Sequence, residues 1–398
     1  MVHSGGSQNV EVVILEARDR IGGRVHTYKS ESAPAKGLYD VGASWIHDPS
    51  INPISIMAKS MQLQTLESDY GDEIVSDLKG QRFNETKFEK DFSQYEMTLF
   101  PSVTTARAEA QSDASLEQIL AGKLDKENPL FQLFLSGLEF ELGSSLRNCS
   151  ATECIDNDWL QAINGVGDSN STHLESYSQP DDYLLPECGF GAVMDGIRSG
   201  AAFRKTNMEP RLRDSDPAQQ QHPTDFCVLL NHEVKHVEQI LSDSGAPLNK
   251  VRLTVHRDHP AGRHVHVIDS SIHSELKANR AEDALGDIVE IVADAVIISV
   301  PLGVLKHGDI RFTPPLSSAK QHAIDSVGFG NVVKVIIEFS QVFWPTHTLF
   351  LALADVQLAN PQDRGLLTYF LNGHKMAGKK VLVGYGLGAG ADRIDAAS

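Results

Sequence analysis

The sequence predicts an α/β fold built from two domains. Several short runs rich in β-branched residues are typical of strands buried in a sheet, and a longer polar block with apolar residues at helical spacing lies among them. The strand-like runs are Asn9–Glu16, Phe226–Leu230, Val234–Ile240, Asp294–Pro301, Asn331–Phe339 and Val381–Val383. The chain has 398 residues. A single core stops growing at roughly 250 residues, so this length indicates two domains.

The composition is that of a folded, acidic protein. Hydrophobic residues make up 41% of the chain and charged residues 22%, which excludes a wholly disordered protein. The formal net charge of −18 argues against nucleic acid or an anionic membrane as a general partner, because both require a cationic surface. An acidic surface is compatible with cationic ligands.

Targeting signals and cysteine usage favour a cytoplasmic protein. No run of about 18 apolar residues predicts a membrane-spanning helix, and the first residues lack the basic and apolar regions of a signal peptide. The four cysteines are too few for a disulfide scaffold and lack the spacing of a zinc site, so we expect reduced thiols. They are Cys149, Cys154, Cys188 and Cys227.

The first strand ends in a carboxylate and leads into a turn with paired glycines among three arginines. In dinucleotide-binding folds an acidic residue at the end of a strand accepts hydrogen bonds from ribose hydroxyls, a role that Glu16 fits. Gly23 lets the backbone approach a ligand closely, and Arg18 and Arg24 are placed to neutralise a diphosphate. Taken alone, Glu16 has a second interpretation as a surface carboxylate at a strand end.

Two further segments carry candidate site residues. Small residues, Gly42, Ala43 and Ser44, lead into Trp45 and His47, as expected where backbone passes against a flat ring system. Lys334 stands inside an apolar strand, where an ammonium needs a partner or a lowered pKa. Each of these two residues has an alternative interpretation. Lys334 could be an edge-strand lysine that reaches solvent, and His47 an ordinary loop histidine.

The block from Phe88 to Leu142 predicts helices, with its apolar residues at helical spacing. Those residues include Leu116, Ile119, Leu120, Leu130 and Phe134. The stretches Arg211–Thr224 and Arg257–Gly286 read as surface insertions. The second contains most of a histidine group that lacks partners at a known ligand spacing, so we predict no metal site. That group is His256, His259, His264, His266 and His273.

Together, ordered motifs along the chain resemble those of the flavin-dependent amine oxidases, the family of monoamine oxidases, polyamine oxidases and lysine-specific histone demethylases. The motifs are VVILEARDRIGGRVHT, DVGASWIH, GFGAVMDGI, HEVKHV, ADAVIISVPLGVLK and FTPPLSSAKQHAIDSVGFGNVVKVIIEF. GASWIH and YFLNGHK look most like polyamine oxidases, whereas PLGVLK and GFGNVVK are also close to the histone demethylases. The resemblance runs from about Val10 to Gly388.

The resemblance implies a particular architecture. We expect an incomplete FAD-binding Rossmann-like domain of the glutathione-reductase type and a mixed α+β substrate-binding domain. The FAD-binding domain would comprise residues 1–67 and 185–302, and the substrate-binding domain residues 68–184 and 303–398.

The resemblance also implies roles for individual residues. Glu16 would bind the adenosine ribose, Arg18 and Arg24 the diphosphate, and the backbone of Val234 the adenine. Ser44 and Trp45 would lie near the flavin.

Lys334 would hold a water against flavin N5, and His47 would place the substrate amine. The implied reaction is hydride transfer from the carbon next to an uncharged amine to FAD, followed by imine hydrolysis and reoxidation by molecular oxygen with release of hydrogen peroxide. Polyamines are the implied substrates, and Glu139, Glu141 and Asp156 are candidates for a cation-attracting funnel, with solvated helix faces as the alternative.

The sequence departs from the family pattern at the cofactor site. Only fifteen residues precede Glu16, too few for a strand, a G-x-G-x-x-G turn and a crossover helix. The family's C-terminal flavin-covering segment is not found after Lys334, so the chain resembles a member truncated at both ends. We therefore expect an exposed edge and apolar face on the Glu16 strand.

Two other functions remain open. One is an FAD-deficient, amine-oxidase-like remnant that acts as a binding protein or an inactive fragment. The other is a histone demethylase, which would need a partner-binding arm and a chromatin-reading module, and neither is visible in the sequence.

Overall fold

The computed structural model describes most of the chain. The described residues are 12–31, 37–68, 72–109, 114–123, 127–153, 182–199, 226–242, 245–257, 288–355 and 364–397. Both predicted insertions fall outside them, apart from Arg257. The chain divides into two compact units, which we call unit 1 (Met1–Gly23 and Glu209–Val327) and unit 2 (Arg24–Met208 and Gly328–Ser398).

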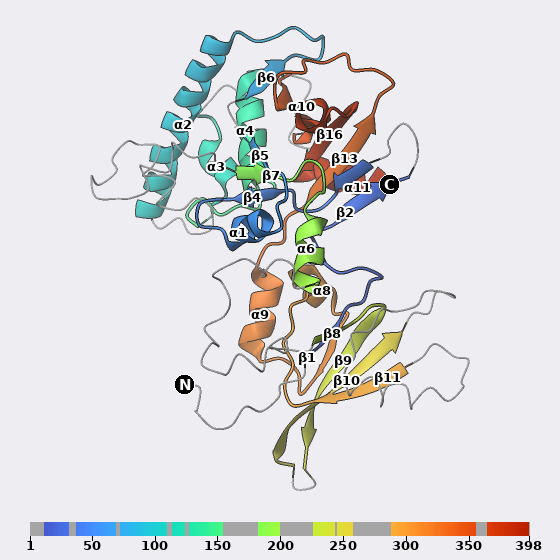
Figure 1. The fold of residues 1–398 in the computed structure, drawn as a ribbon. Coiled ribbons are helices and arrows are strands. Elements are labelled where there is room, and N and C mark those ends of the chain that lie inside the picture. Colours follow the sequence, from blue (N-terminus) through green and yellow to red (C-terminus); the bar gives the residue numbers. More distant parts are fainter. Residues whose placement is uncertain are drawn as a thin grey trace. The chain divides into compact units, whose positions relative to one another are not determined.

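The described part of unit 1 contains two sheets (Figure 1). A two-stranded parallel sheet pairs β1 (Val12–Leu15) with β8 (Phe226–Leu229). A four-stranded sheet has the order β11-β10-β9-β12. Its strands are β9 (His232–Leu241), β10 (Pro247–Arg257), β11 (Ile288–Ala293) and β12 (Arg311–Thr313). The described helices of this unit are α8 (Leu302–His307) and α9 (Ser318–Ser326).

Two predictions about unit 1 have different outcomes. The expected apolar exposure on the first strand is confirmed, since Val12 is 37% exposed and Ile14 45%. The predicted buried strand Asp294–Pro301 is wrong: residues 295–300 have no regular secondary structure, and Ile297 is 94% exposed. Among the described residues the parallel sheet has two strands, so this apolar run has no neighbour to pair with.

Unit 2 is built on a five-stranded sheet with the order β13-β16-β15-β14-β6. Its strands are β6 (Glu73–Ser76), β13 (Val332–Glu338), β14 (Phe350–Leu353), β15 (Leu366–Asn372) and β16 (Val381–Leu387). Strand β6 runs parallel to β14, and the other pairs are antiparallel. The predicted strands at Asn331–Phe339 and Val381–Val383 are therefore confirmed.

Two smaller sheets and several helices surround it (Figure 1). One sheet pairs β2 (Thr27–Ser30) with β3 (Gly37–Asp40); the other joins β4 (Trp45–His47), β7 (Asp182–Leu184) and β5 (Leu66–Ser68). The helices are α1 (Pro53–Ser60), α2 (Glu85–Ala108), α3 (Leu116–Leu120), α4 (Pro129–Leu142), α6 (Gly191–Arg198), α10 (Gly373–Ala377) and α11 (Ala389–Ala397).

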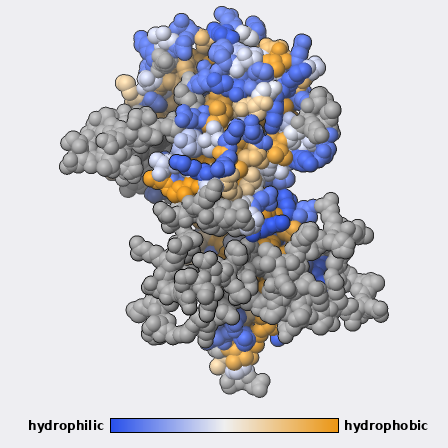
Figure 2. Space-filling model, viewed as in Figure 1, coloured by the Kyte–Doolittle hydropathy of each residue, from blue (hydrophilic) through white to orange (hydrophobic). Residues whose placement is uncertain are grey.

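The predicted helical block is confirmed as α2, α3 and α4. Helix α4 begins where the Asn128 side chain accepts from Leu130 N with Pro129 in the first turn, and it ends at Gly143 in the left-handed conformation (φ 59°). Most of α4 is buried, and it packs beside α2 over the sheet edge that carries Val75. The visible face of unit 2 is mainly hydrophilic, with scattered apolar patches (Figure 2).

The predicted domain bounds and the two units do not coincide. Residues 24–67 and 185–199 belong to unit 2, whereas the predicted FAD-binding domain included them. Residues 303–327 belong to unit 1. The functional assignment of each domain and its Rossmann-like character stay predictions.

Candidate functional site

The Lys334 ammonium lies against the turn that follows β3. Lys334 is on β13, which is an edge strand, but its side chain is half-buried and turned to protein acceptors. Its Nζ donates to the carbonyl oxygen of Asp40 at 3.3 Å, to the carbonyl oxygen of Gly42 and to Ser44 Oγ. The alternative of an edge-strand lysine that reaches solvent is therefore wrong.

Two aromatic faces complete the surroundings of this ammonium. Lys334 Nζ is 5.4 Å from the ring centroid of Trp45 and 5.8 Å from that of Tyr385, within cation–π range. Lys334 and Tyr385 are directly opposite each other on neighbouring strands. Burial lowers the pKa of Lys334 to about 8, and the Asp40 carboxylate opposes that shift.

The Gly42–Trp45 turn owes its small residues to close backbone packing. A Cβ on Gly42 would lie 2.1 Å from the carbonyl oxygen of Arg24, so this position excludes any larger residue. Ala43 is exposed, and Ser44 is buried and engaged by Lys334. The structure thus brings Gly42, Ser44, Trp45 and Lys334 together.

A small cavity lies beside this group in unit 2. Its volume is about 50 Å³, room for one or two water molecules, and its lining includes Ser44, Asp40, Lys379 and Tyr385. The Tyr385 hydroxyl is buried and receives no hydrogen bond from the part of the chain that the structure describes. An ammonium donor, two aromatic faces, an exposed alanine and this unsatisfied hydroxyl fit the edge of a flavin and a bound water.

His47 lies in a second polar group with two carboxylates. Strands β4 and β7 pair His47 with Asp182, and His47 Nδ1 donates to Asp182 Oδ2 at 2.8 Å. The histidine side chain is 70% exposed and that of Asp182 only 5%. Glu141 keeps contact with solvent, but the surrounding protein removes part of its hydration, and this raises its pKa. The charge of Asp182 adds to the rise, and His47 opposes it.

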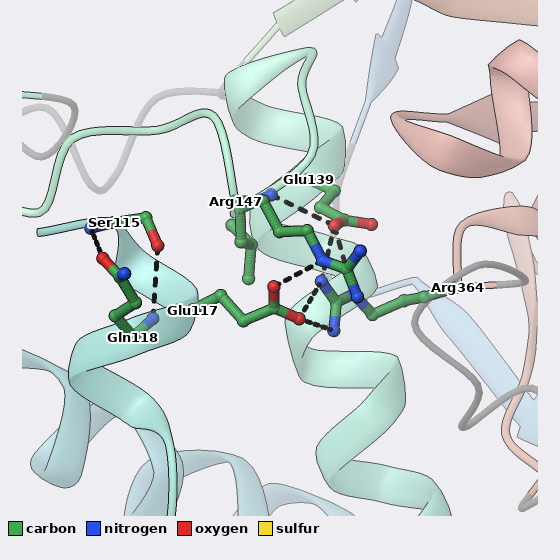
Figure 3. A network of polar contacts seen from close by, with 7 residues as sticks. Ser115, Glu117, Gln118, Glu139, Arg147 and Arg364 are labelled. Atoms are coloured by element: carbon green, nitrogen blue, oxygen red, sulfur yellow. Dashed lines mark hydrogen bonds and ion pairs between the residues drawn. The ribbon is translucent and has the colours of Figure 1, made fainter.

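The funnel candidates separate into different environments. Glu139 is not a funnel residue: it is 1% exposed and accepts from Arg364 Nη2 at 2.9 Å and Nε at 3.1 Å (Figure 3). Glu117 and Arg147 extend this network on the side of α3. Glu141 stays a candidate because it lies near His47, and Asp156 is outside the described residues.

The remaining predicted cofactor residues lie mainly in unit 1. Glu16 accepts from Arg18 N at 2.8 Å, and its backbone oxygen accepts from His232 N at the start of β9. Val234, further along β9, therefore lies near the end of β1. Gly23, with φ 55°, and Arg18 are exposed. Arg24, in unit 2, is also exposed.

Sequence reasoning missed Asp40, Thr27, Tyr385 and Asp182. Asp40 accepts from Thr27 Oγ1 and from the backbone of Phe190, although these residues are far apart in the chain. The signals available were a carboxylate two positions before GASWIH and an aromatic residue in an apolar strand, neither of which specifies a partner.

The described ranges carry neither a membrane-spanning helix nor a cluster of metal ligands. There, no helix combines the length and apolarity needed to cross a bilayer. Over the same ranges, no three histidine, cysteine, aspartate or glutamate side chains gather as metal ligands would. His259, His264, His266 and His273 lie outside them.

Known proteins resemble this chain over most of its length. Polyamine oxidase 3 of Oryza sativa subsp. japonica is 27% identical over 94% of this chain and 62% of its own length. The probable polyamine oxidase 4 of Arabidopsis thaliana is 27% identical over 94% of this chain and 61% of its own length. Lysine-specific histone demethylase 1 homolog 3 of Arabidopsis thaliana is 26% identical over 96% of this chain and 22% of its own length. The chain thus spans about three fifths of the length of the first two relatives.

Solved structures agree in fold. A putrescine oxidase triple mutant with redesigned cofactor binding superposes with a TM-score of 0.57 at 15% identity, covering 96% of this chain and 71% of that one. A single mutant of putrescine oxidase from the same redesign gives 0.56 at 16% identity over the same shares. These superpositions show the amine oxidase fold, with its mixed α/β content. The family model for flavin containing amine oxidoreductases matches residues 4–179 and 227–398. This chain belongs to the flavin containing amine oxidoreductases, a family whose cofactor is FAD.

Proposed function

We propose that this chain acts as an FAD-dependent oxidase of polyamines such as spermine, spermidine or their acetylated forms. The observation that carries the proposal is the position of Lys334 Nζ against Gly42, Ser44 and the Trp45 ring, in a chain that belongs to the flavin containing amine oxidoreductases. Relatives named polyamine oxidases support the choice of substrate class.

When bound, FAD would supply the acceptor for hydride from the carbon next to the amine, and molecular oxygen would reoxidise it with release of hydrogen peroxide. Lys334 would hold a water at the flavin edge, beside the cavity that Tyr385 and Ser44 line. We assign contacts with the adenosine and diphosphate side to Glu16, Arg18, Gly23, Arg24 and Val234.

His47, Asp182 and Glu141 would receive the cationic substrate. Asp182 orients the imidazole through the 2.8 Å hydrogen bond, and the carboxylates attract a protonated amine group of the polyamine. The raised pKa of Glu141 lets this residue take up a proton near neutral pH more readily than an ordinary glutamate. A neutral amine is required at the carbon that is oxidised, so a nearby proton acceptor favours the reaction.

The test is an amine panel followed by a variant. FAD-loaded protein should release hydrogen peroxide with spermine or spermidine, and Lys334→Met should slow reoxidation of the reduced flavin by about a hundredfold in stopped flow, the scale of a lost proton-transfer group. Arg147→Met removes an exposed cation that pairs with Glu117, so it is the control and should leave reoxidation unchanged. Peroxide release that depends on a histone peptide would support the demethylase alternative, and no retained flavin would support the remnant.

A further inference from the structure

We propose that the Asp40 carboxylate is the shared counter-ion of Lys334 and Lys379, and that it holds the Lys334 ammonium charged against the Gly42–Ser44 turn. Asp40 would thus be a positioning residue for Lys334. Its importance for flavin reoxidation rests on the proposed function, but the charge coupling itself does not.

The fold fixes the Asp40 carboxylate at one place. Both of its oxygens accept from Phe190 N, at 2.9 and 3.0 Å, at the start of α6. Thr27 Oγ1 on β2 donates to Oδ1 at 2.5 Å and itself accepts from Gly191 N at 2.7 Å. Phe190 supplies no capping side chain of its own, so the carboxylate also completes the end of α6 and faces its positive dipole end.

Glycine at position 189 is what allows this contact. Gly189 has φ 68°, and a Cβ there would lie 2.4 Å from Thr27 Cγ2 and 2.8 Å from Asp40 Oδ1. The GFG motif therefore closes over the Thr27–Asp40 pair. A carboxylate held by these donors cannot swing away, so its distance from the lysines is set by the backbone.

Asp40 lies beside both half-buried lysines: its backbone oxygen accepts from Lys334 Nζ at 3.3 Å, and Asp40 and Lys379 line the same small cavity. Burial lowers the pKa of Lys334 and of Lys379, and in each case Asp40 opposes the shift. Lys379 Nζ donates to the carbonyl oxygen of Leu38 at 2.8 Å and lies 4.6 Å from the ring centroid of Tyr39. Two ammonium groups thus lie near one carboxylate, which favours the charged form of each.

Among the described residues, the other groups that contact Lys334 supply no negative charge. The turn offers carbonyl oxygens, a hydroxyl and the Trp45 ring, and β16 offers Tyr385, whose burial and proximity to Asp40 raise its pKa. Cys188 is also near enough to feel this charge: burial, Asp40 and Glu187 raise its pKa. Burial raises the pKa of Asp40 itself, while Thr27, Phe190, Lys334 and Lys379 lower it.

The experiment measures the titration of Lys334 directly in the full chain without added flavin. Lysine labelled with ¹³C at Cε is followed by NMR from pH 4 to 11, and the Lys334 signal is assigned as the one lost in Lys334→Met. Asp40→Asn keeps the side-chain shape and removes the charge, so the Lys334 midpoint should fall by about one pH unit. Lys379→Met should raise the midpoint, because Asp40 then serves one cation.

Asp91→Asn is the matched control. It removes a carboxylate that pairs with Lys87 on α2, so it should leave the Lys334 midpoint unchanged. A Lys334 midpoint that is the same in Asp40→Asn as in the wild type, with an unchanged far-UV circular dichroism spectrum, would overturn the proposal. If Asp40→Asn does not fold, the titration of the wild type decides. The chemical shift of its Lys334 signal should show a second inflection at acid pH, where Asp40 takes up a proton. A chemical shift that stays constant at acid pH would contradict the coupling.

The same variants then separate this coupling from the proposed function. In FAD-loaded protein, the pH profile of flavin reoxidation should move with the Lys334 midpoint. If the midpoint moves in the NMR titration and the reoxidation profile does not, the Asp40 coupling stands and the role of Lys334 in reoxidation fails.

Discussion

Lys334 Nζ and the backbone oxygen of Asp40 lie 3.3 Å apart, although 294 positions separate the two residues in the sequence. The contact joins the edge strand of the large sheet to the last residue of β3, just before the Gly42–Trp45 turn. Because the same ammonium also reaches Gly42 and Ser44, one side chain fixes the conformation of a segment predicted to lie beside the flavin.

Replacing Lys334 should change how stability depends on pH. The pKa of this lysine falls from 10.5 when unfolded to about 8 when folded, so between these values the unfolded state binds more protons and stability rises with pH. The rise in the free energy of unfolding that is attributable to Lys334 is about 3 kcal/mol, since each pKa unit corresponds to about 1.36 kcal/mol. Lys334→Met should lack this rise in urea titrations at pH 7, 8, 9 and 10.5. Parallel pH profiles for the two proteins would contradict the buried position of the ammonium.

A methyl group at position 42 should disturb the turn strongly. Gly42→Ala puts a Cβ 2.1 Å from the carbonyl oxygen of Arg24, and the backbone must shift to admit it. We expect a loss of about 2–3 kcal/mol in the free energy of unfolding, the cost of overpacking a closed site. The control is Gly328→Ala, where an added Cβ meets nothing within 4 Å. Equal losses in the two variants would show that close packing is not the cause.

The buried ion pair of Glu139 should be far more sensitive than its exposed neighbour. Arg364→Met leaves a charged carboxylate at a side chain that is 1% exposed, which costs about 3–5 kcal/mol. Arg147→Met removes an arginine that is 53% exposed from the same network and should cost less than about 1 kcal/mol. Arg364→Met combined with Glu139→Leu should recover part of the loss. Urea titrations at pH 7 measure all three, and a double variant no more stable than Arg364→Met speaks against an unpaired charge as the cause.

Glu73 should make the protein less stable as pH rises. Burial raises its pKa from 4.5 to about 7, so between these values the folded state holds a proton that the unfolded state has released. The resulting cost, about 3 kcal/mol, is fully present above pH 7 and absent below 4.5. Glu73→Gln should therefore be more stable than the wild type at pH 8, with the gain vanishing at pH 4.5. A gain that is independent of pH would place the effect in packing and not in ionisation.

The parts of the fold that follow from local pattern were predictable. Apolar spacing predicted the helical block, and Leu116, Leu120, Leu130 and Phe134 are indeed at most 6% exposed. Lys334 was found from one physical conflict, an ammonium inside an apolar strand. Its outcome was predictable because burial of a charge demands acceptors.

The failures come from contacts that no local pattern encodes. The apolar run Asp294–Pro301 has the composition of a buried strand, but strand formation also requires a neighbour, and the described residues supply none. Glu139 looked like a candidate for a substrate funnel because its partner, Arg364, lies 225 residues away. Asp40 was overlooked for the same reason, since Thr27 and the start of α6 reach it only in the folded chain.

The most direct test of the central claim is a visible absorption spectrum of the purified chain after incubation with FAD and desalting. The account predicts that the absorbance of oxidised flavin, at about 450 nm, is retained and then bleached by anaerobic spermine. A colourless protein after desalting would contradict it, because an oxidase of this family cannot act without the cofactor.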